Sequence, residues 1–538
     1  MKKGFLLIIL VVLMFSLVLG GCTKSASTTL STTPSTTPST TTSMPTSTTT
    51  QATGPISGGV LVRISAPPSN PIGWPPASAA LIRDLKKNIE LVEPLWYIDE
   101  KVNVQPMLAE SWDWAPDRTS ITFHLRKGVK FHDGTDWNAQ AAKFMFDAFV
   151  ANKNIGASTW KSIDVVDDNT LRISFSQVTS LQKFYIANVR FISLTAYQQL
   201  GKDGVAWNPI GTGPFKMGTY VKDVSLTVAR NDNYWGKKPY LDGIKWVYSL
   251  DDQTAEAMMI AGNANLLVFA TDKIGADLKN KGFEVRLTKS PDVYTLLFDS
   301  ANPDSPFAKK EVRQAVNYAI DRQGLCDAFG YGYMKVEYQI AWSSSWGFNP
   351  GLALFAYDPV KARQLLKDAG YPNGFPTDLT IPNTFPLNIY TAIQANLQSV
   401  GIDAKMNIVD IGAFIGMTRI SGWKGIAGGI IEGLDTLYAM AQKFSVVGGK
   451  GVYSKLKVPE GMQPLLDQAV ATEDFNTQKS LVQQMAKLSY DEAMVINFAS
   501  HGELAILAKG IHDFDWFPTQ SSEWWDPCKV WLDKDARK

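Results

Sequence analysis

The sequence is poor in the residues that carry most metal and nucleophile chemistry. It has only three cysteines and four histidines among 538 residues. The histidines are never paired at a spacing typical of metal ligands, and no HExxH motif, GxSxG elbow or Cys/His zinc pattern is present. The sequence therefore predicts no metal site, no cofactor and no catalytic residue, and a structural role for His124, His132, His501 and His512.

An excess of charge of one sign is also missing. Lys and Arg number 52, Asp and Glu number 51, and the formal net charge is +1. This balance gives no overall attraction to nucleic acid or to an anionic membrane. Beyond the N-terminus no apolar run is long enough to span a bilayer. Length and a hydrophobic content of 45% instead predict two or three globular domains.

The N-terminus reads as a lipoprotein signal peptide over residues 1–22. Lys2 and Lys3 precede an apolar run over residues 5–19, and small residues then lead to Cys22. Cys22 is the expected lipidation site, and an uncleaved transmembrane anchor is the alternative. Residues 23–57 are mostly Ser, Thr and Pro, which predicts a disordered tether. The Ser/Thr-rich composition is also compatible with an O-glycosylated stalk. For Cys326 and Cys528 we favour two separate buried thiols over a disulfide.

Residues 106–139 predict a strand, a turn and the start of a helix. Ile121, Phe123 and Leu125 alternate with polar residues, as in a strand with one buried face. Asp133 and Gly134 then predict a tight turn, and Asn138 predicts the cap of a helix. Further on, Asp358, Pro359 and Gly370 predict a helix within residues 357–371. Apolar spacing predicts helical structure over residues 307–325 and 463–492.

Several motifs together resemble one known family. LAESW and TFHLRKGVKFHDGT in the first segment, GTGPF at 211–215, RNDNYW at 230–235, VRQAVNYAIDR at 312–322 and YDPVKARQLLKDAGY at 357–371 are similar to signatures of the family 5 extracellular solute-binding proteins. Asp232 departs from the proline of the family pattern. The motifs occur in the family's order, and the resemblance covers nearly all of residues 58–538.

The resemblance implies a bilobal α/β fold like that of type II periplasmic binding proteins, with the ligand buried between the lobes. Lobe I would comprise residues 58–105, 210–290 and 509–538, with an inserted subdomain over residues 106–209. Lobe II would comprise residues 291–508. The C-terminal tryptophans would pack back onto lobe I.

The family's peptide-binding members suggest an anchor for the ligand. In them an aspartate shortly before an Asp-Pro pair receives the ligand's α-ammonium. Glu432 falls at the position of that aspartate, Asp435 matches the later aspartate, and Thr436 replaces the proline. A carboxylate facing an ammonium group forms a charge-assisted pair. The sequence thus favours a peptide-like ligand, with a helix-cap or surface role for this pair as the alternative.

An oligosaccharide is the second ligand class, because some family members bind cello-oligosaccharides and tryptophan faces stack on sugar rings. The candidate rings, each of which core packing would also explain, are Trp74, Trp96, Trp342, Trp346 and Trp423. The expected role is that of a monomeric, non-enzymatic receptor on the outer face of the cytoplasmic membrane, or in a periplasm if an outer membrane exists. Its partners would be the permease and ATPase subunits of an ABC importer. A secreted hydrolase and a non-transporting sensor remain as alternatives.

Overall fold

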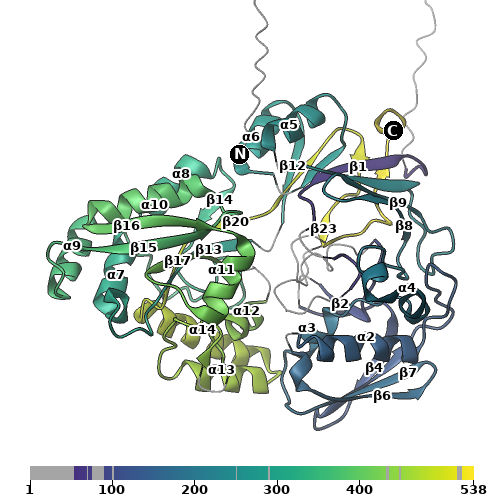
Figure 1. Cartoon of the computed structure of the whole chain (residues 1–538), viewed down its shortest axis with the longest axis horizontal. Helices are drawn as coiled ribbons and strands as arrows, with labels where there is room; N and C mark the ends of the chain where they lie inside the picture. The colour runs from purple at the N-terminus through teal and green to yellow at the C-terminus, as the bar shows by residue number, and fades with distance from the viewer. Residues whose placement is uncertain are drawn as a thin grey trace, which may run out of the picture. The chain divides into compact units, whose positions relative to one another are not determined.

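The structure is a computed structural model that describes residues 54–68, 71–74, 90–99, 102–154, 156–249, 251–268, 270–288, 291–431, 435–447, 450–517 and 524–537. Cys22 and Glu432 lie outside these residues, as do the expected signal peptide and most of the expected tether. Three large β-sheets organise the described part of the chain (Figure 1).

The first sheet has seven strands and is built from segments far apart in the sequence. Strand β1 is parallel to its neighbours β10 and β11, and the other pairs are antiparallel. Helices α5 (Asp252–Ile260) and α6 (Asp272–Asn280) share a buried cluster with one face of this sheet. In order across the sheet, the strands are β12 (Glu284–Leu287), β21 (Leu504–Leu507), β11 (Leu266–Val268), β1 (Val60–Ser65), β10 (Gly243–Tyr248), β9 (Ser225–Arg230) and β8 (Phe215–Val221).

The second sheet has six strands and its own apolar core. Strand β15 runs parallel to β16 and β17, whereas β13, β14, β17 and β20 pair antiparallel. Helices α7 (Lys310–Ala319), α8 (Arg322–Phe329), α9 (Pro359–Asp368) and α10 (Leu387–Ser399) contribute to this core. The strand order is β14 (Met334–Val336), β20 (Val495–His501), β13 (Asp292–Phe298), β17 (Ile426–Ile431), β15 (Phe375–Pro382) and β16 (Ile402–Val409).

The third sheet lies within the segment expected as an inserted subdomain. It is antiparallel, with the order β4 (Ala109–Trp114), β5 (Ser120–Leu125), β7 (Thr170–Phe175) and β6 (Trp160–Asp167). Helix α2 (Ala139–Ala151) follows, and the Asn138 side chain accepts a bond from the Ala141 amide. The predicted strand and helix cap are therefore confirmed. Helices α3 (Gln182–Ala187) and α4 (Leu194–Ala206) complete this segment.

Four further helices and several short strand pairs complete the described fold. Helices α12, α13 and α14 pack together, and α11 lies against β15. Their bounds are α11 (Ile411–Gly416), α12 (Thr436–Phe444), α13 (Met462–Ala471) and α14 (Phe475–Asp491). The short pairs are β2 (Trp96–Ile98) with β3 (Val104–Pro106), β18 (Val446–Val447) with β19 (Lys450–Gly451), β22 (Ile511–His512) with β25 (Trp531–Leu532), and β23 (Trp516–Phe517) with β24 (Trp524–Trp525).

The chain passes between the seven- and six-stranded sheets through β12 to β13 and through β20 to β21. Thr288 of the first crossing and Glu503 of the second bind each other: the Thr288 amide donates to the Glu503 carbonyl at 3.0 Å, and the Glu503 amide donates to the Thr288 hydroxyl at 3.0 Å. Strand β21 pairs with β11 and β12 and so belongs to the seven-stranded sheet, although it lies within residues 291–508, which the sequence assigned to lobe II.

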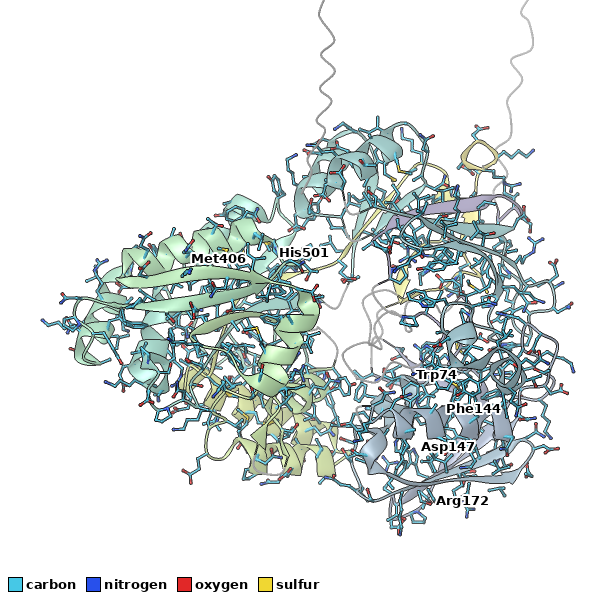
Figure 2. All side chains as sticks on the ribbon, viewed as in Figure 1. Trp74, Phe144, Asp147, Arg172, Met406 and His501 are labelled. Carbon is cyan, nitrogen blue, oxygen red and sulfur yellow. The ribbon has the colours of Figure 1, made fainter. Side chains whose placement is uncertain are left out.

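An ion pair joins the two sheets next to this crossing. His501 ends β20, and its Nδ1 lies 2.9 Å from Oδ1 of Asp272 at the start of α6. Burial opposes a charge on this imidazole, but the bond and charge of Asp272, together with Asp292 and Glu503, raise the pKa of His501. The position of His501 at the junction is visible in Figure 2. The predicted structural role of this histidine agrees with the contact.

A buried carboxylate joins two of the family motifs. Glu93 accepts bonds from the Thr212 hydroxyl at 2.7 Å, the Tyr234 hydroxyl at 2.7 Å and Trp235 Nε1 at 2.8 Å. Burial raises the pKa of Glu93 from its ordinary 4.5 to about 7, although the three donors oppose this shift. Residues of GTGPF and RNDNYW thus meet at one buried carboxylate.

A third motif, VRQAVNYAIDR, contains two buried arginines. Arg313 donates to the carbonyls of Phe307, Ala308, Glu492 and Ala493. Arg322 donates to the carbonyls of Asn317, Glu337 and Asn497 at 3.0–3.2 Å. Each guanidinium thus fixes several chain segments by satisfying backbone acceptors that would otherwise be buried without donors.

Most local expectations are confirmed, but both predicted helical stretches are divided. Residues 463–492 form α13 and α14, separated at residues 472–474. Asp358 caps α9, and Gly370 after its end has a positive φ of 93°. The expected helical stretch over residues 307–325 is instead divided, because Ile320 is extended and Asp321 caps a new helix by accepting from the Gly324 amide. Side chains that cap helices compete with helix continuation.

The remaining cysteines are unpaired and buried. Burial raises the pKa of the Cys326 thiol to about 12, so this thiol stays protonated at neutral pH. Trp525, from the C-terminal segment, donates to Glu90 at 2.6 Å and is buried. Among the described residues, no helix combines the length and apolarity needed to cross a bilayer.

Candidate functional site

The site begins with Asp435, which the sequence marked for the ligand. It caps α12: its Oδ1 accepts from the Tyr438 amide at 3.0 Å. Its Oδ2 accepts from Trp346 Nε1 at 2.7 Å. Burial raises the pKa of Asp435, while these two donors and the charge of Lys183 act in the opposite direction. The sequence reasoning named Asp435 and Trp346 for two different ligands, yet the structure joins them in one contact.

The loop that carries Trp346 is itself held by buried polar contacts. Glu337 accepts from the Ser343 amide at 2.9 Å, from the Ser343 hydroxyl at 2.8 Å and from the Ser500 hydroxyl at 3.0 Å. Gly347 lets the loop lie directly on the helices, since a Cβ there would come within 2.4 Å of a Val482 methyl carbon and 2.9 Å of a Thr436 methyl carbon. Trp346 is therefore placed by a preformed loop.

Helix α3 of the expected inserted subdomain contacts the same end of α12. The Tyr438 hydroxyl accepts from Asn188 Nδ2 at 3.3 Å. Its ring centroid lies 5.0 Å from that of Phe184 and 6.0 Å from that of Tyr185. Lys183 of α3 is the residue whose positive charge favours ionised Asp435. Side chains about 250 residues apart thus meet at the start of one helix.

A second group of contacts extends this interface toward α13 and α14. The Ser180 amide donates to the Val470 carbonyl at 2.8 Å, and Gln478 Nε2 donates to the Ser180 hydroxyl at 3.1 Å. Arg118 pairs with Glu473 at the surface. These contacts, together with those of Tyr438, join the segment 106–209 to the helices that follow β17.

Four of the five tryptophans proposed for sugar stacking are buried in this structure. Trp74 stacks on Tyr197 with ring centroids 4.6 Å apart and lies near Phe144, as labelled in Figure 2. Trp96 is fully buried and donates to the Lys183 carbonyl at 3.0 Å. The other two, Trp342 and Trp423, are 4% and 5% exposed. Trp346 alone among the five is half-buried, and its indole N–H is used by Asp435.

Sequence reasoning missed Tyr438, Asn188, Lys183 and Glu337. Tyr438 falls on the helical spacing after Asp435 and could have been noticed. The others carry no local signal, because their roles depend on α3 and on the loop before Trp346 reaching α12. Within the described ranges, no group of three or more His, Cys, Asp or Glu side chains is placed to hold a metal ion.

The cap at Asp435 gives a testable contribution to stability. Replacement of Asp435 by Ala removes a helix cap and the acceptor of Trp346, and we expect a loss of about 2 kcal/mol in the free energy of unfolding. In Asp435→Asn the single carbonyl oxygen can accept from only one of the two donors, so we expect this variant to lose about 1 kcal/mol in the free energy of unfolding. Urea unfolding of the three proteins measures the series. If Asp435→Asn and Asp435→Ala lower the free energy of unfolding equally, the helix cap contributes nothing to stability. If Asp435→Asn is as stable as the parent, the bond from Trp346 contributes nothing.

The two main sheets, joined by two crossings, and the additional four-stranded sheet define the class: a bilobal α/β binding protein of the type II periplasmic arrangement. Solved structures share this fold. The periplasmic binding protein DppA of Helicobacter pylori, solved with the peptide STSA, superposes with a TM-score of 0.76 at 23% identity, over 89% of this chain and 99% of that one. The oligopeptide-binding protein AppA of Bacillus subtilis, solved with a nonapeptide, superposes with a TM-score of 0.74 at 21% identity, over 89% of this chain and 100% of that one.

Sequence comparison identifies the family. The family model described as "Bacterial extracellular solute-binding proteins, family 5 Middle" matches residues 103–439. The glutathione-binding protein GsiB of Shigella flexneri is 33% identical over 333 residues, which are 59% of this chain and 64% of that protein. GsiB of Shigella dysenteriae is 30% identical over 426 residues, 74% of this chain and 81% of that one. The chain belongs to the family 5 extracellular solute-binding proteins, which confirms the resemblance found in its motifs.

Proposed function

We propose that this protein is the substrate-binding receptor of an ABC importer and captures a peptide-like ligand between its two lobes. The observation that carries the proposal is family membership over most of the chain, together with the named ligands of its relatives: glutathione for GsiB, and peptides for the solved DppA and AppA. Closure of the lobes on the ligand would present a form recognised by the permease, and the ATPase subunits would supply the energy.

We place the ligand's ammonium group at Glu432, three residues before the cap of α12. The family resemblance implies that this position corresponds to the amine-binding aspartate of peptide-binding members, and a carboxylate–ammonium pair is a charge-assisted interaction. The neighbouring Asp435 is occupied by Trp346 and Tyr438, which supports a positioning role for Asp435 rather than direct ligand binding. We further propose that Cys22 carries the lipid anchor and that the receptor acts on the outer face of the membrane.

Four of the five candidate tryptophans are buried, and the half-buried fifth, Trp346, donates to Asp435, so we do not advance the oligosaccharide role as a second function. A hydrolase would cleave these ligands, so mass spectrometry of the ligand after incubation distinguishes a hydrolase from a receptor. A non-transporting sensor would lack a permease partner, so uptake of ligand through the reconstituted permease distinguishes a transport receptor from a sensor.

A thermal-shift screen of the full-length protein tests the proposal. A ligand present at about 100 times its Kd stabilises the folded state by about 2.7 kcal/mol, which raises the midpoint measurably. We expect glutathione, Met-Leu and Ser-Thr-Ser-Ala to raise the thermal midpoint and cello-oligosaccharides to leave it unchanged. We expect Glu432→Gln to weaken the binding of these peptides about 10-fold or more. N-acetyl peptides, which lack the ammonium, should bind the parent and the variant equally.

A sugar that shifts the midpoint while all peptides fail would overturn the peptide assignment. Equal weakening of free and N-acetyl peptides by Glu432→Gln would leave the receptor role in place and remove Glu432 as the amine anchor.

A further inference from the structure

Contacts between the segment 106–209 and helices α12, α13 and α14 form a second connection between the two halves of the described fold. The segment is inserted between β1 and β8 of the seven-stranded sheet, and the three helices lie between β17 and β20 of the six-stranded sheet. The crossing strands join these halves through the chain itself. The second connection consists only of non-covalent contacts, so it can separate while each half stays folded.

We call this second connection the latch and define it by the residues that contact each other across it. The segment 106–209 contributes its turn between β4 and β5 and the region around α3, and the helices contribute α12 and the neighbouring parts of α13 and α14. The members are Arg118, Ser180, Phe184 and Asn188 on the segment, and Tyr438, Val470, Glu473 and Gln478 on the helices.

The interior of the latch mixes apolar and polar side chains. Phe184 and Tyr438 belong to one buried cluster that contains residues from both sides. Ser180 and Asn188 are buried beside them, at 7% and 6% exposure, and each bonds across the latch, to Gln478 and to Tyr438 respectively. Water can replace both bonds when the two sides separate. Such a polar interior is typical of contacts between domains that move, whereas a permanent core is more apolar.

An ion pair lies at the exposed rim of the latch. Arg118, in the turn between β4 and β5, pairs with Glu473, in the turn between α13 and α14. The guanidinium also lies over the Trp114 ring, with Cζ 4.4 Å from the ring centroid. The two charged side chains are 34% and 50% exposed, so water solvates both when they part. The rim therefore contributes an attraction that can be broken and formed again.

The latch reaches the candidate site through Tyr438. Its ring and hydroxyl face α3, while its backbone amide donates to Asp435, which also accepts from Trp346. The start of α12 is thus held by the latch on one side and by the loop of Trp346 on the other. Each polar side chain of the latch already has a protein partner, so the latch contributes to closure by itself, in addition to the ligand.

Resting on the proposed function, we propose that the latch holds the two lobes closed and thereby slows release of the ligand. Ligand contacts and latch contacts then stabilise the same closed form, and the latch sets how much of that form exists before the ligand adds its own contribution. A weaker latch lowers the closed population, so the ligand leaves faster.

Exchange of the two rim charges tests the latch without altering its buried part. Arg118→Glu and Glu473→Arg each place like charges at the rim, and the double variant restores the attraction with the charges exchanged. We expect each single variant to lower the ratio of closed to open form about 3- to 10-fold, and to speed ligand dissociation by a similar factor. The double variant should recover most of both losses.

Spin labels on the full-length protein measure the separation of the two sides. Lys161→Cys on β6 and Lys479→Cys on α14 place the labels at exposed positions, and the described native cysteines, Cys326 and Cys528, are buried. The parent without the added cysteines is the control for labelling. Pulsed electron resonance gives the distribution of label distances in the parent and the three rim variants. Stopped-flow fluorescence gives the dissociation rates of glutathione and Met-Leu from the same four proteins.

Longer label distances and faster dissociation in both single variants, with recovery in the double variant, are the expected result. Equal distances or equal dissociation rates in all four proteins would overturn the latch and make these contacts a fixed part of the fold. Single variants without recovery in the double variant would overturn it as well, because the two charges would not act as a pair.

Two checks keep the outcome interpretable. Circular dichroism and the thermal midpoint verify that each variant is folded, and if a rim variant does not fold, Ser180→Ala, which removes the bond from Gln478, takes its place. If the label distances respond as expected but neither glutathione nor Met-Leu binds, the proposed peptide ligand fails while the contact between the lobes stands.

Discussion

Replacement of Arg322 by methionine is expected to lower the free energy of unfolding by about 3–5 kcal/mol, because three buried carbonyl oxygens lose their donor and each costs about 1–3 kcal/mol when left unpaired. These are the carbonyls of Asn317, Glu337 and Asn497. Burial lowers the pKa of Arg322 to about 10, so the group remains charged at neutral pH and its bonds are charge-assisted. Urea unfolding monitored by tryptophan fluorescence measures the loss.

The matched control is Arg172→Met. Arg172 is exposed on β7, and its contact is a single 3.3 Å bond from Nε to the Thr122 hydroxyl. We expect a change within about 0.5 kcal/mol for this surface position. Arg322→Lys should fall between the two, because an ammonium cannot reach the same three carbonyls in a fixed geometry. A loss of under 1 kcal/mol for Arg322→Met would show that water replaces the guanidinium at these carbonyls.

Glu93 is expected to make stability depend on pH. In the folded protein the pKa of Glu93 is raised to about 7, above its ordinary 4.5, so the unfolded chain releases this proton at lower pH than the folded protein does. The contribution of Glu93 to stability is therefore greatest below pH 4.5, declines as the pH rises, and levels off above about 7. The total decline is roughly 3 kcal/mol.

Glu93→Gln isolates this effect, since glutamine does not ionise. Its carbonyl oxygen can accept from Thr212 and Trp235, which share Oε2 of Glu93, while the Tyr234 bond to Oε1 is lost at every pH and does not affect the slope. The stability of the parent minus that of the variant should fall by about 2–3 kcal/mol between pH 4.5 and pH 8. Guanidinium unfolding at half-unit pH intervals measures both curves. If the stability curves of the parent and the variant run parallel against pH, the three donors offset the cost of burying the charge and the pKa of Glu93 is not shifted.

The local elements and the family could be predicted from the sequence. Period-two alternation identified β5, and capping residues identified the starts of α2 and α9. These signals are readable because strand period, cap and turn are set by residues a few positions apart. Where two local signals competed, as at Asp321, the capping side chain prevailed over helical spacing and divided the predicted stretch.

The motifs led to the correct fold class but did not predict the contacts that their residues make. GTGPF and RNDNYW lie about 20 residues apart in sequence but converge on Glu93, more than 100 residues upstream. The carbonyl acceptors of Arg313 and Arg322 come from segments up to 180 residues away.

Tertiary structure alone decided which residues form the site. Asp435 and Trp346 are 89 positions apart, and Asn188 and Tyr438 are 250 apart. The use of Trp346 as a donor to Asp435 and the burial of the other candidate tryptophans follow from strand order and from packing between separate segments. Such contacts depend on the register of whole sheets, and no period or spacing within a single segment encodes them.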